Sequence, residues 1–313
     1  MKKIFCAVLA LAAMASCSKE YIVAEDKQAI GFGEAFVDNG TRADYSQLNK
    51  PVEAFKVYGT LTGSYGNTVQ IFNGADVTKP TNNYFDNGVY DSTEAWICTE
   101  TTQYWVPNAT YQFAAIVDGV AETTTTLPEE IKFTVKDGTD NKDLLYATAE
   151  ASVNNNGVVT TGINASGLVA FSFNHLLSKV MFTVNSNIGT GYSIKVTGIS
   201  VTGVAQDGIY TVGAATPWTK DGDATTTLTF GKEGAYETRQ ILPVEQTLNV
   251  TISYDIYFGG TKISAATKSG TINKTFAVNT VYNIVATITM TNEIKFTVEE
   301  VRDWVVDPNN ITL

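Results

Sequence analysis

The chain has 313 residues, of which 44% are hydrophobic, and carries a formal net charge of −11 at pH 7. This length and apolar content are sufficient for two domains that each bury a core. The acidic balance argues against nucleic acid as a partner and against peripheral attachment to anionic lipid.

The amino-terminal residues have the pattern of a bacterial lipoprotein signal. Two lysines precede an uncharged apolar run over residues 4–14, which is shorter than the roughly 20 residues that a membrane-spanning helix needs. Small residues then lead to Cys17, as in a lipobox. We expect residues 1–16 to be removed and Cys17 to receive fatty acyl chains such as palmitate, which would hold the precursor on a membrane. The alternative is an ordinary signal peptide with an incidental cysteine.

A first strand is predicted over residues 28–38, in which Ile30, Phe32 and Phe36 share one face. A polar run that contains Arg42 follows at once, and such runs are accessible to proteases. Removal of the strand would expose a sheet edge and an apolar groove, which are a template for pairing with another chain.

Arginine is rare in this chain, which bears on proteolytic processing. It occurs only at Arg42, Arg239 and Arg302, so an arginine-specific protease would meet one target in the first 238 residues. Such a protease would therefore act on the amino-terminal part of the chain at Arg42 alone.

Strands with period-two alternation follow along the rest of the chain. Between residues 247 and 258 the even-numbered positions are apolar and most odd-numbered positions are polar, and 282–290 and 294–298 repeat this pattern. Further strands, rich in Val, Ile, Thr, Tyr and Phe, are predicted at 54–61, 111–117, 131–135, 179–184, 194–201 and 226–230. Clusters of Gly, Asn, Asp and Pro separate them. Many short strands in regular succession are typical of β-sandwiches, and the mature length indicates two in tandem.

One short helix is predicted at 143–151, and no long helical period is evident. A boundary between the two sandwiches is expected within 152–170, where Asn, Gly and Ser concentrate and the alternation lapses. We therefore place an amino-terminal sandwich at 43–165 and a carboxyl-terminal sandwich at 166–313.

No constellation of residues predicts catalysis or metal binding, and no cofactor is expected. His175 is the single histidine, and we interpret it as a structural hydrogen-bonding residue because metal and Ser/His or Cys/His sites need partners. Cys98 is expected to be a small core residue without a disulfide partner. The Gly31-Phe32-Gly33 motif lacks the third glycine and the helix of a dinucleotide site. The aromatic residues between 96 and 111 favour a core over a glycan-binding platform.

The carboxyl terminus supplies a candidate donor strand. Trp304 and Val306 precede Pro308, which interrupts regular strand pairing, and Ile311 and Leu313 follow it. The last strand is expected to end before this proline, which leaves a tail that could enter another subunit. The alternative is that the tail completes its own sheet, and charged residues beside Trp304 weaken the case for a continuous donor strand.

Several short motifs occur in order along nearly the whole chain. They are Ile30-Gly31-Phe32, Gly40-Thr41-Arg42-Ala43, Phe55-Lys56-Val57-Tyr58-Gly59-Thr60, Tyr104-Trp105-Val106-Pro107, Tyr111-Gln112-Phe113-Ala114-Ala115, Asp143-Leu144-Leu145-Tyr146-Ala147, Phe173-Asn174-His175-Leu176-Leu177-Ser178-Lys179-Val180, Leu242-Pro243 and Asn279-Thr280-Val281-Tyr282. Through these motifs the chain resembles the fimbrillin-like (Mfa-like) family of Bacteroidales, which contains the major and minor fimbrillins of type V pili. One departure is Val106 between Trp105 and Pro107, where the family often has Trp-Pro directly.

The resemblance implies two transthyretin-like β-sandwich domains and a defined assembly route. Members reach the outer membrane and the cell surface as lipoproteins, and an arginine-specific surface protease then removes an amino-terminal segment that includes the first strand. In this chain that propeptide is residues 17–42, and the cleaved bond joins Arg42 to Ala43. The emptied groove accepts a strand from the carboxyl terminus of another pilin subunit, in a homo- or heteropolymer, and a fimbria that serves cell adhesion grows.

The sequence therefore leaves two functions from different classes open. The first is a structural pilus subunit that polymerises by donor-strand exchange. The second is a surface-anchored lipoprotein that binds glycans or host ligands, as the tip adhesin or anchor subunit of the same pilus. The first residue of the mature protein separates them, because Ala43 indicates the pilin and acylated Cys17 the tethered binder. The resemblance does not choose among stalk, tip and anchor, and an enzyme is not expected.

Overall fold

The computed structural model describes residues 28–37, 52–80, 95–122, 126–289 and 294–301. Within these ranges the regular structure consists of β-strands and one 3₁₀ turn, η2 (Gly138–Asp140). No helix in this described part is long and apolar enough to cross a membrane. The all-β class predicted from the period-two alternation is therefore confirmed.

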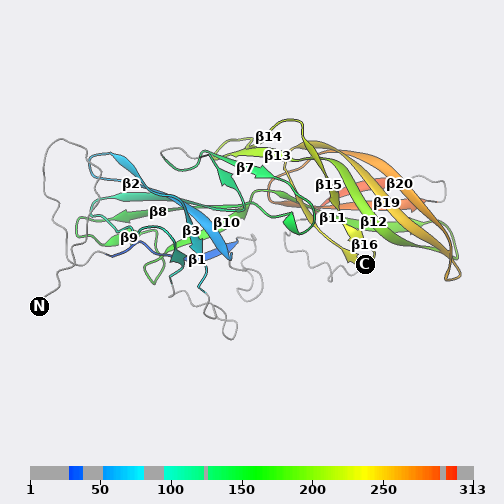
Figure 1. Ribbon diagram of the computed structural model, residues 1–313, viewed down its shortest axis with the longest axis horizontal. Helices are drawn as coiled ribbons and strands as arrows, with labels where there is room; N and C mark the ends of the chain where they lie inside the picture. Colours follow the sequence, from blue (N-terminus) through cyan, green and yellow to red (C-terminus); the bar gives the residue numbers. More distant parts are fainter. Residues whose placement is uncertain (1–27, 38–51, 81–94, 123–125, 290–293, 302–313) are drawn as a thin grey trace, which may run out of the picture.

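The first sheet has eight strands, most of them from the amino-terminal half of the chain (Figure 1). In spatial order it consists of β1 (Phe32–Val37), β10 (Val169–His175), β8 (Leu145–Val153), β5 (Thr110–Val117), β2 (Ala54–Thr62), β3 (Thr68–Thr78) and β4 (Ile97–Cys98), with β9 (Val159–Thr161) paired to β8. Neighbouring strands are antiparallel except β1 and β10, which run parallel. The predicted strands at 54–61 and 111–117 correspond to β2 and β5.

β10 passes from one layer of this sheet to another. Its last two residues pair with β8, whereas residues 169–173 pair with β1. The rings of Phe171 and Phe173 face the ring of Phe55 in β2, with centroid separations of 5.3 and 5.6 Å. The pair β1–β10 is therefore a second, two-stranded layer with an aromatic core between it and the rest of the sheet.

A small sheet drawn from both halves of the chain covers the opposite face of β5. It contains β14 (Trp218–Lys220), β13 (Asp207–Thr211), β7 (Glu130–Thr134) and β6 (Val120–Ala121) in spatial order, and Figure 1 shows it between the other sheets. Ala114 and Ile116 of β5 belong to the same core cluster as Ile131 and Trp218 of this sheet. Because β5 is covered on both faces, its residues 113–116 are all buried and do not alternate.

Two four-stranded sheets form the carboxyl-terminal half and share one core. The first contains β18 (Arg239–Ile241), β11 (Ser178–Asn187), β21 (Thr280–Thr289) and β22 (Ile294–Val301). The second contains β15 (Thr225–Thr229), β12 (Tyr192–Ala205), β19 (Glu245–Phe258) and β20 (Thr261–Thr275). A hairpin of β16 (Gly231–Lys232) and β17 (Ala235–Tyr236) adjoins β12. Phe182 of β11 meets Phe230 edge-on at 4.7 Å across the core. Alternate residues of β19 from 246 to 254 are buried, as the sequence pattern predicts, whereas Ile256 is half-buried and Phe258 is exposed.

The predicted helix at 143–151 is wrong, because residues 145–153 form the strand β8 in the first sheet. Leu145, Ala147, Ala151 and Val153 alternate inward and are buried. Alanine has a high intrinsic preference for helix, but pairing of residues 145–152 with β5 and burial of these four side chains outweigh that preference.

The sheets do not separate at the boundary expected between residues 165 and 166. β10, which the sequence assigned to the carboxyl-terminal sandwich, lies in the first sheet, and β7 pairs with β13 from the other half. The polar segment 152–170 instead contains turns on either side of β9. A core cluster also continues from β5 through β7 to β12 and β19, so residues from both halves are buried together.

An ion cluster beside η2 surrounds Arg239, which is only 6% exposed. Its guanidinium donates to Asp137 (Nε to Oδ1, 3.1 Å) and to Glu237. Asp137 also accepts hydrogen bonds from the backbone N–H and the hydroxyl of Thr229, at 2.9 and 2.7 Å. Burial raises the pKa of Asp137, but the hydrogen bonds from Thr229, Gly138 and Arg239 outweigh this effect and hold the pKa below its usual 3.8.

Replacement of Asp137 by asparagine should therefore remove an acid-sensitive contribution to stability. Because the folded-state pKa is depressed, the carboxylate stabilises the fold above its unfolded pKa, and this contribution is lost as the pH falls through the folded value. We expect Asp137→Asn to lower the free energy of unfolding by about 1–2 kcal/mol at neutral pH. Urea unfolding at a series of pH values should show the gap to wild type closing below the usual pKa of 3.8. The exposed Asp223→Asn is the control, and a gap for Asp137→Asn that stays constant with pH would contradict the prediction.

Candidate functional site

The first strand lies in a groove, and residues on both sides of the groove form hydrogen bonds with its backbone. Along one edge β1 runs parallel to β10, with Phe32 opposite Val169. Along the other edge the N–H of Trp96 donates to the carbonyl of Phe32 at 2.8 Å, and the N–H of Val52 donates to the carbonyl of Ala35 at 3.1 Å. β1 is last in the order of its sheet, yet its outer backbone edge is not left open.

The residues just before β1 are held in the same way. The N–H of Ile30 donates to the carbonyl of Gln103 at 2.8 Å, and the N–H of Trp105 donates to the carbonyl of Gln28 at 3.1 Å. On the other side, the N–H of Val169 donates to the carbonyl of Gly31 at 2.9 Å. We call the space that residues 28–37 occupy, between β10 and residues 52, 96 and 103–105, the leader groove.

Phe32 is the central side chain of the leader groove and is 1% exposed. Four rings surround it, those of Phe72, Phe113, Phe171 and Phe55, with centroid separations of 5.4, 6.0, 6.0 and 6.4 Å. Full burial of a side chain of this size contributes about 1.5–3 kcal/mol, and each favourable aromatic pair adds roughly 0.5–1.5 kcal/mol. Phe32 therefore joins the two-stranded layer to the rest of the core.

The structure does not place Phe36 on the face that it was predicted to share with Ile30 and Phe32. The pairing with β10 shifts between Gly33 and Ala35, which marks a β-bulge. Ala35 is fully buried and Val37 packs against the aromatic core, whereas Phe36 is half-buried and is not part of that core cluster. One extra residue reverses the faces of all residues after it, so the period-two pattern fails at this point.

On the outer face of the segment, the side chain of Leu168 lies over both glycines. A Cβ atom at Gly31 would lie 2.7 Å from Cδ2 of Leu168, and one at Gly33 would lie 2.7 Å from its Cδ1. Neither glycine has a positive φ, so their backbone conformation does not demand glycine. The Gly31-Phe32-Gly33 motif is thus explained by packing, with a large ring on the core face and no side chain on the other.

Loss of residues 28–37 would leave two kinds of group without a partner, namely backbone N–H groups and aromatic rings. The N–H groups of Val52, Trp96, Trp105 and Val169 would lose their acceptors, and an unpaired buried donor costs about 1–3 kcal/mol. The ring of Phe171 and its neighbours would line an apolar hole. An emptied leader groove is therefore unfavourable until another strand refills it.

The other predicted site residues lie outside the residues that the structure describes. They are the lipidation site Cys17, the cleavage site Arg42 and Ala43, and the donor-tail residues Trp304, Val306, Ile311 and Leu313. The last described strand, β22, ends at Val301 and pairs with β21 on one side.

The residues considered for chemistry have structural surroundings. His175 is 6% exposed and its Nδ1 is hydrogen-bonded to Asp143, as expected of a structural histidine. Cys98 is half-buried rather than buried, and burial raises the pKa of its thiol. Trp96 and Trp105 are buried in the aromatic core. Among the described residues no three His, Cys, Asp or Glu side chains gather as metal ligands would.

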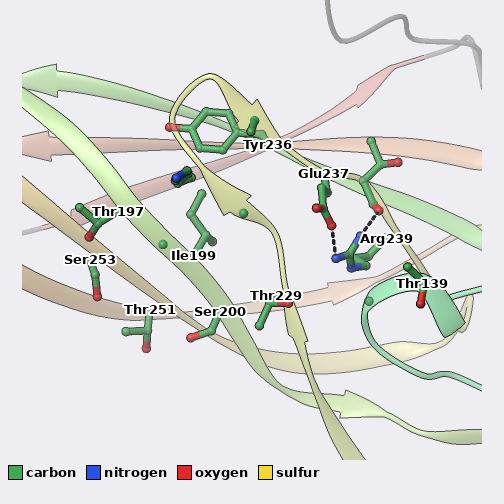
Figure 2. A pocket seen from close by; sticks show the side chains of 16 residues that line it. Thr139, Thr197, Ile199, Ser200, Thr229, Tyr236, Glu237, Arg239, Thr251 and Ser253 are labelled. Atoms are coloured by element: carbon green, nitrogen blue, oxygen red, sulfur yellow. Dashed lines mark hydrogen bonds and ion pairs between the residues drawn. The ribbon is translucent and has the colours of Figure 1, made fainter.

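A hollow of about 1070 Å³ lies over β12 and β19, beside the β16–β17 hairpin (Figure 2). Hydroxyl side chains line it, including those of Thr197, Ser200 and Thr251. Its one carboxylate, Glu237, is bound by Arg239, as Figure 2 shows. The lining residues include no histidine, cysteine or aspartate, so the hollow offers no nucleophile with a free general base.

The bulge in β1 can be tested with a matched pair of substitutions in one strand. Phe32→Ala should lower the free energy of unfolding of the full chain by about 3–5 kcal/mol, because it empties the centre of a ring cluster. Phe36→Ala removes the same atoms from a half-buried position and should cost about 1 kcal/mol. Guanidinium unfolding measures both. Equal losses for the two variants would contradict the assignment of the bulge.

Comparison with known proteins agrees with this architecture. A family model described as fimbrillin-like matches residues 41–304. A fimbrial protein from Bacteroides vulgatus has a TM-score of 0.55 and 17% identity, and the match covers 90% of this chain and 100% of that chain. A protein from Bacteroides uniformis, described as a cell adhesion candidate, has a TM-score of 0.51 and 18% identity, and the match covers 89% of this chain and 99% of that chain. A protein from Bacteroides ovatus with the same description has a TM-score of 0.53 and 13% identity, and the match covers 90% of this chain and 100% of that chain. No curated protein matches the chain.

At these identities the solved structures establish a shared fold, and the family match carries the assignment. The match begins immediately before Arg42 and extends past the end of β22, so it includes nearly all of the described strands. The family comprises fimbrial structural proteins and not enzymes. The chain therefore belongs to the fimbrillin-like family.

Proposed function

We propose that this chain is a pilus subunit that is exported as a lipoprotein, is cleaved after Arg42 and is polymerised by donor-strand exchange. It acts at the outer membrane and cell surface, where the fimbria serves adhesion. The observation that carries the proposal is the leader groove, in which one short segment completes both the aromatic core and the backbone hydrogen bonds of its neighbours.

The contacts of the leader groove suit replacement of one strand by another. Most of them are made by backbone atoms or by Phe32, so an incoming strand can reproduce them without matching every side chain. The unpaired N–H groups and the exposed rings that cleavage would leave favour refilling over an empty state. A fibre joined in this way would dissociate slowly.

The burial of Arg239 supports cleavage at Arg42 and not at Arg239. Arg239 is 6% exposed and its guanidinium is bound by Asp137 and Glu237, so a protease cannot reach it without unfolding the cluster. The other two arginines, Arg42 and Arg302, lie outside the described residues. Cleavage at Arg42 would remove residues 28–37 together with any lipid on Cys17.

The carboxyl-terminal tail has the length that donation requires. Residues 302–313 follow β22, and twelve residues extend over roughly 40 Å at about 3.3 Å per residue. The leader groove holds the ten residues 28–37, which span roughly 33 Å. A tail of this length from another subunit could therefore span the leader groove.

Processing is tested by Arg42→Ala, which should leave a lipid-anchored monomer. Without cleavage the leader segment stays in its groove, and no donor strand can enter. Mass spectrometry of the surface protein should show acylated Cys17 at its amino terminus instead of Ala43, and detergent-resistant polymers should disappear.

The matched controls for this prediction are Arg42→Lys and Arg302→Ala. Arg42→Lys keeps the positive charge and should also block an arginine-specific protease, whereas Arg302→Ala should leave an amino-terminal Ala43. Undiminished polymer from Arg42→Ala would overturn the proposal.

Donation by the tail is tested by deletion of residues 308–313. The truncated subunit should keep the unfolding midpoint of the full chain, because no described strand is removed. It should still be cleaved and still accept a strand, but it should donate none. Added to wild-type subunits, it should cap growing fibres and shorten them, as electron microscopy can measure. Fibres of unchanged length would place the donor elsewhere.

A further inference from the structure

We propose that Leu168 makes the leader groove selective: it admits a strand of a second pilin subunit that places a large aromatic ring at the Phe32 position and the smallest possible residues on either side of that ring. This inference rests on the proposed function, because it concerns the strand that replaces residues 28–37. It names the residue that decides which strands fit.

The inner wall of the leader groove requires a ring. Phe32 contacts the rings of Phe55, Phe72, Phe113 and Phe171, and it is 1% exposed. A smaller side chain at this position would leave a cavity among rigid rings from four different strands, and such cavities are poorly closed by relaxation. The Phe32 position is therefore the main source of affinity.

The outer wall excludes side chains next to that ring. A Cβ atom at Gly33 would lie 2.7 Å from Cδ1 and 3.3 Å from Cβ of Leu168, and one at Gly31 would lie 2.7 Å from Cδ2. The methyl groups of Leu168 make the shortest contact at each position, whereas its Cβ is close to the Gly33 position only. Any residue larger than glycine at these positions must therefore rotate or displace the Leu168 side chain, and Leu168→Ala removes the blocking methyl groups.

The backbone of Leu168 is held so that it cannot withdraw easily. Its N–H donates to Oδ1 of Asn164 at 3.0 Å, and its carbonyl accepts from the N–H of Asn164 at 2.8 Å. The same Oδ1 accepts from the N–H of Ser166, and Gly167 closes the turn with a φ of +78°. Leu168 is 8% exposed, and Val169 directly after it begins the strand that pairs with Phe32.

The groove is thus closed on four sides around a single strand. β10 bonds one edge, residues 52, 96 and 103–105 bond the other, the ring cluster covers the core face, and Leu168 covers the outer face. The tail of this chain is an informative probe of the rule, because its only aromatic residue, Trp304, lies between Asp303 and Val305, which both carry side chains. It should enter the wild-type groove less well than the chain's own leader strand.

The steric role of Leu168 is tested on the full chain by a double-mutant cycle. Glycine inside a strand is normally less stable than alanine, so Gly33→Ala should raise the melting temperature unless a neighbour blocks it. We expect Gly33→Ala to lower the melting temperature by several degrees in wild type and to raise it, or leave it unchanged, in a Leu168→Ala background.

Gly198→Ala in β12 is the matched control, because nothing lies within 4 Å of a Cβ at that position and its φ is not positive. It should behave alike in both backgrounds. The same effect of Gly33→Ala with and without Leu168 would overturn the assignment of Leu168.

Selectivity is tested by peptide capture on the full chain after cleavage with an arginine-specific protease. Fluorescent peptides of residues 28–38 are compared as wild type, Gly33→Val and Phe32→Ala, together with a peptide of residues 300–313. The Gly33→Val peptide should bind about tenfold or more weakly to wild-type protein and recover on Leu168→Ala protein, whereas Phe32→Ala should be weak on both. The tail peptide should also gain affinity on Leu168→Ala protein.

The two parts of the experiment separate the inference from the proposed function. Equal binding of the wild-type and Gly33→Val peptides to wild-type protein would overturn the selectivity. If no peptide is captured, including the wild-type leader sequence, strand exchange itself fails, and the selectivity that depends on it fails too. The melting cycle would then still decide whether Leu168 excludes side chains beside Phe32.

Discussion

The amino-terminal core depends on the contacts that β1 makes with β10 and with residues 52, 96 and 103–105. Without β1, the layer opposite β2 and β5 would consist of β10 alone. Even two isolated strands are marginal in water, because few backbone bonds and little apolar burial offset the entropy of ordering them. The fold therefore needs a strand at this position, although the strand need not come from the same chain.

The contacts of the leader groove are those that the proposed replacement of one strand by another requires. The backbone hydrogen bonds of the groove do not depend on the sequence of the strand. The main side-chain requirement is a large ring at Phe32, which packs among four aromatic rings. On the outer face, glycine is favoured on both sides of this ring because Leu168 lies over Gly31 and Gly33. In the proposed exchange, a strand would thus be accepted for its shape more than for a long series of matched residues.

The rest of the fold provides a firm support for β1. β5 and β2 are packed on one face against the aromatic core and on the other against the sheet of β7 and β13, which joins both halves of the chain by antiparallel pairing. The ion cluster of Asp137, Arg239 and Glu237 also links η2 to the carboxyl-terminal sheets. In the proposed fibre, load carried by a donated strand would pass directly into a core shared by both halves.

Much of the secondary structure follows from local pattern, because a strand with one buried face must alternate and turns must contain residues that permit them. The strands near 54–61, 111–117 and 247–258 and the buried positions of Ile30 and Phe32 are recognisable on that basis.

The sequence by itself thus determined the β class, the family resemblance and the large ring at Phe32. Tertiary structure alone decided the layers: that 145–153 is the strand β8, that β10 joins β1, and that a bulge turns Phe36 away while Ala35 faces the core. It also decided why two glycines flank Phe32, because Leu168 is more than 130 residues away in the chain. Strand partners and covering side chains are distant in sequence, and local periodicity contains no information about them.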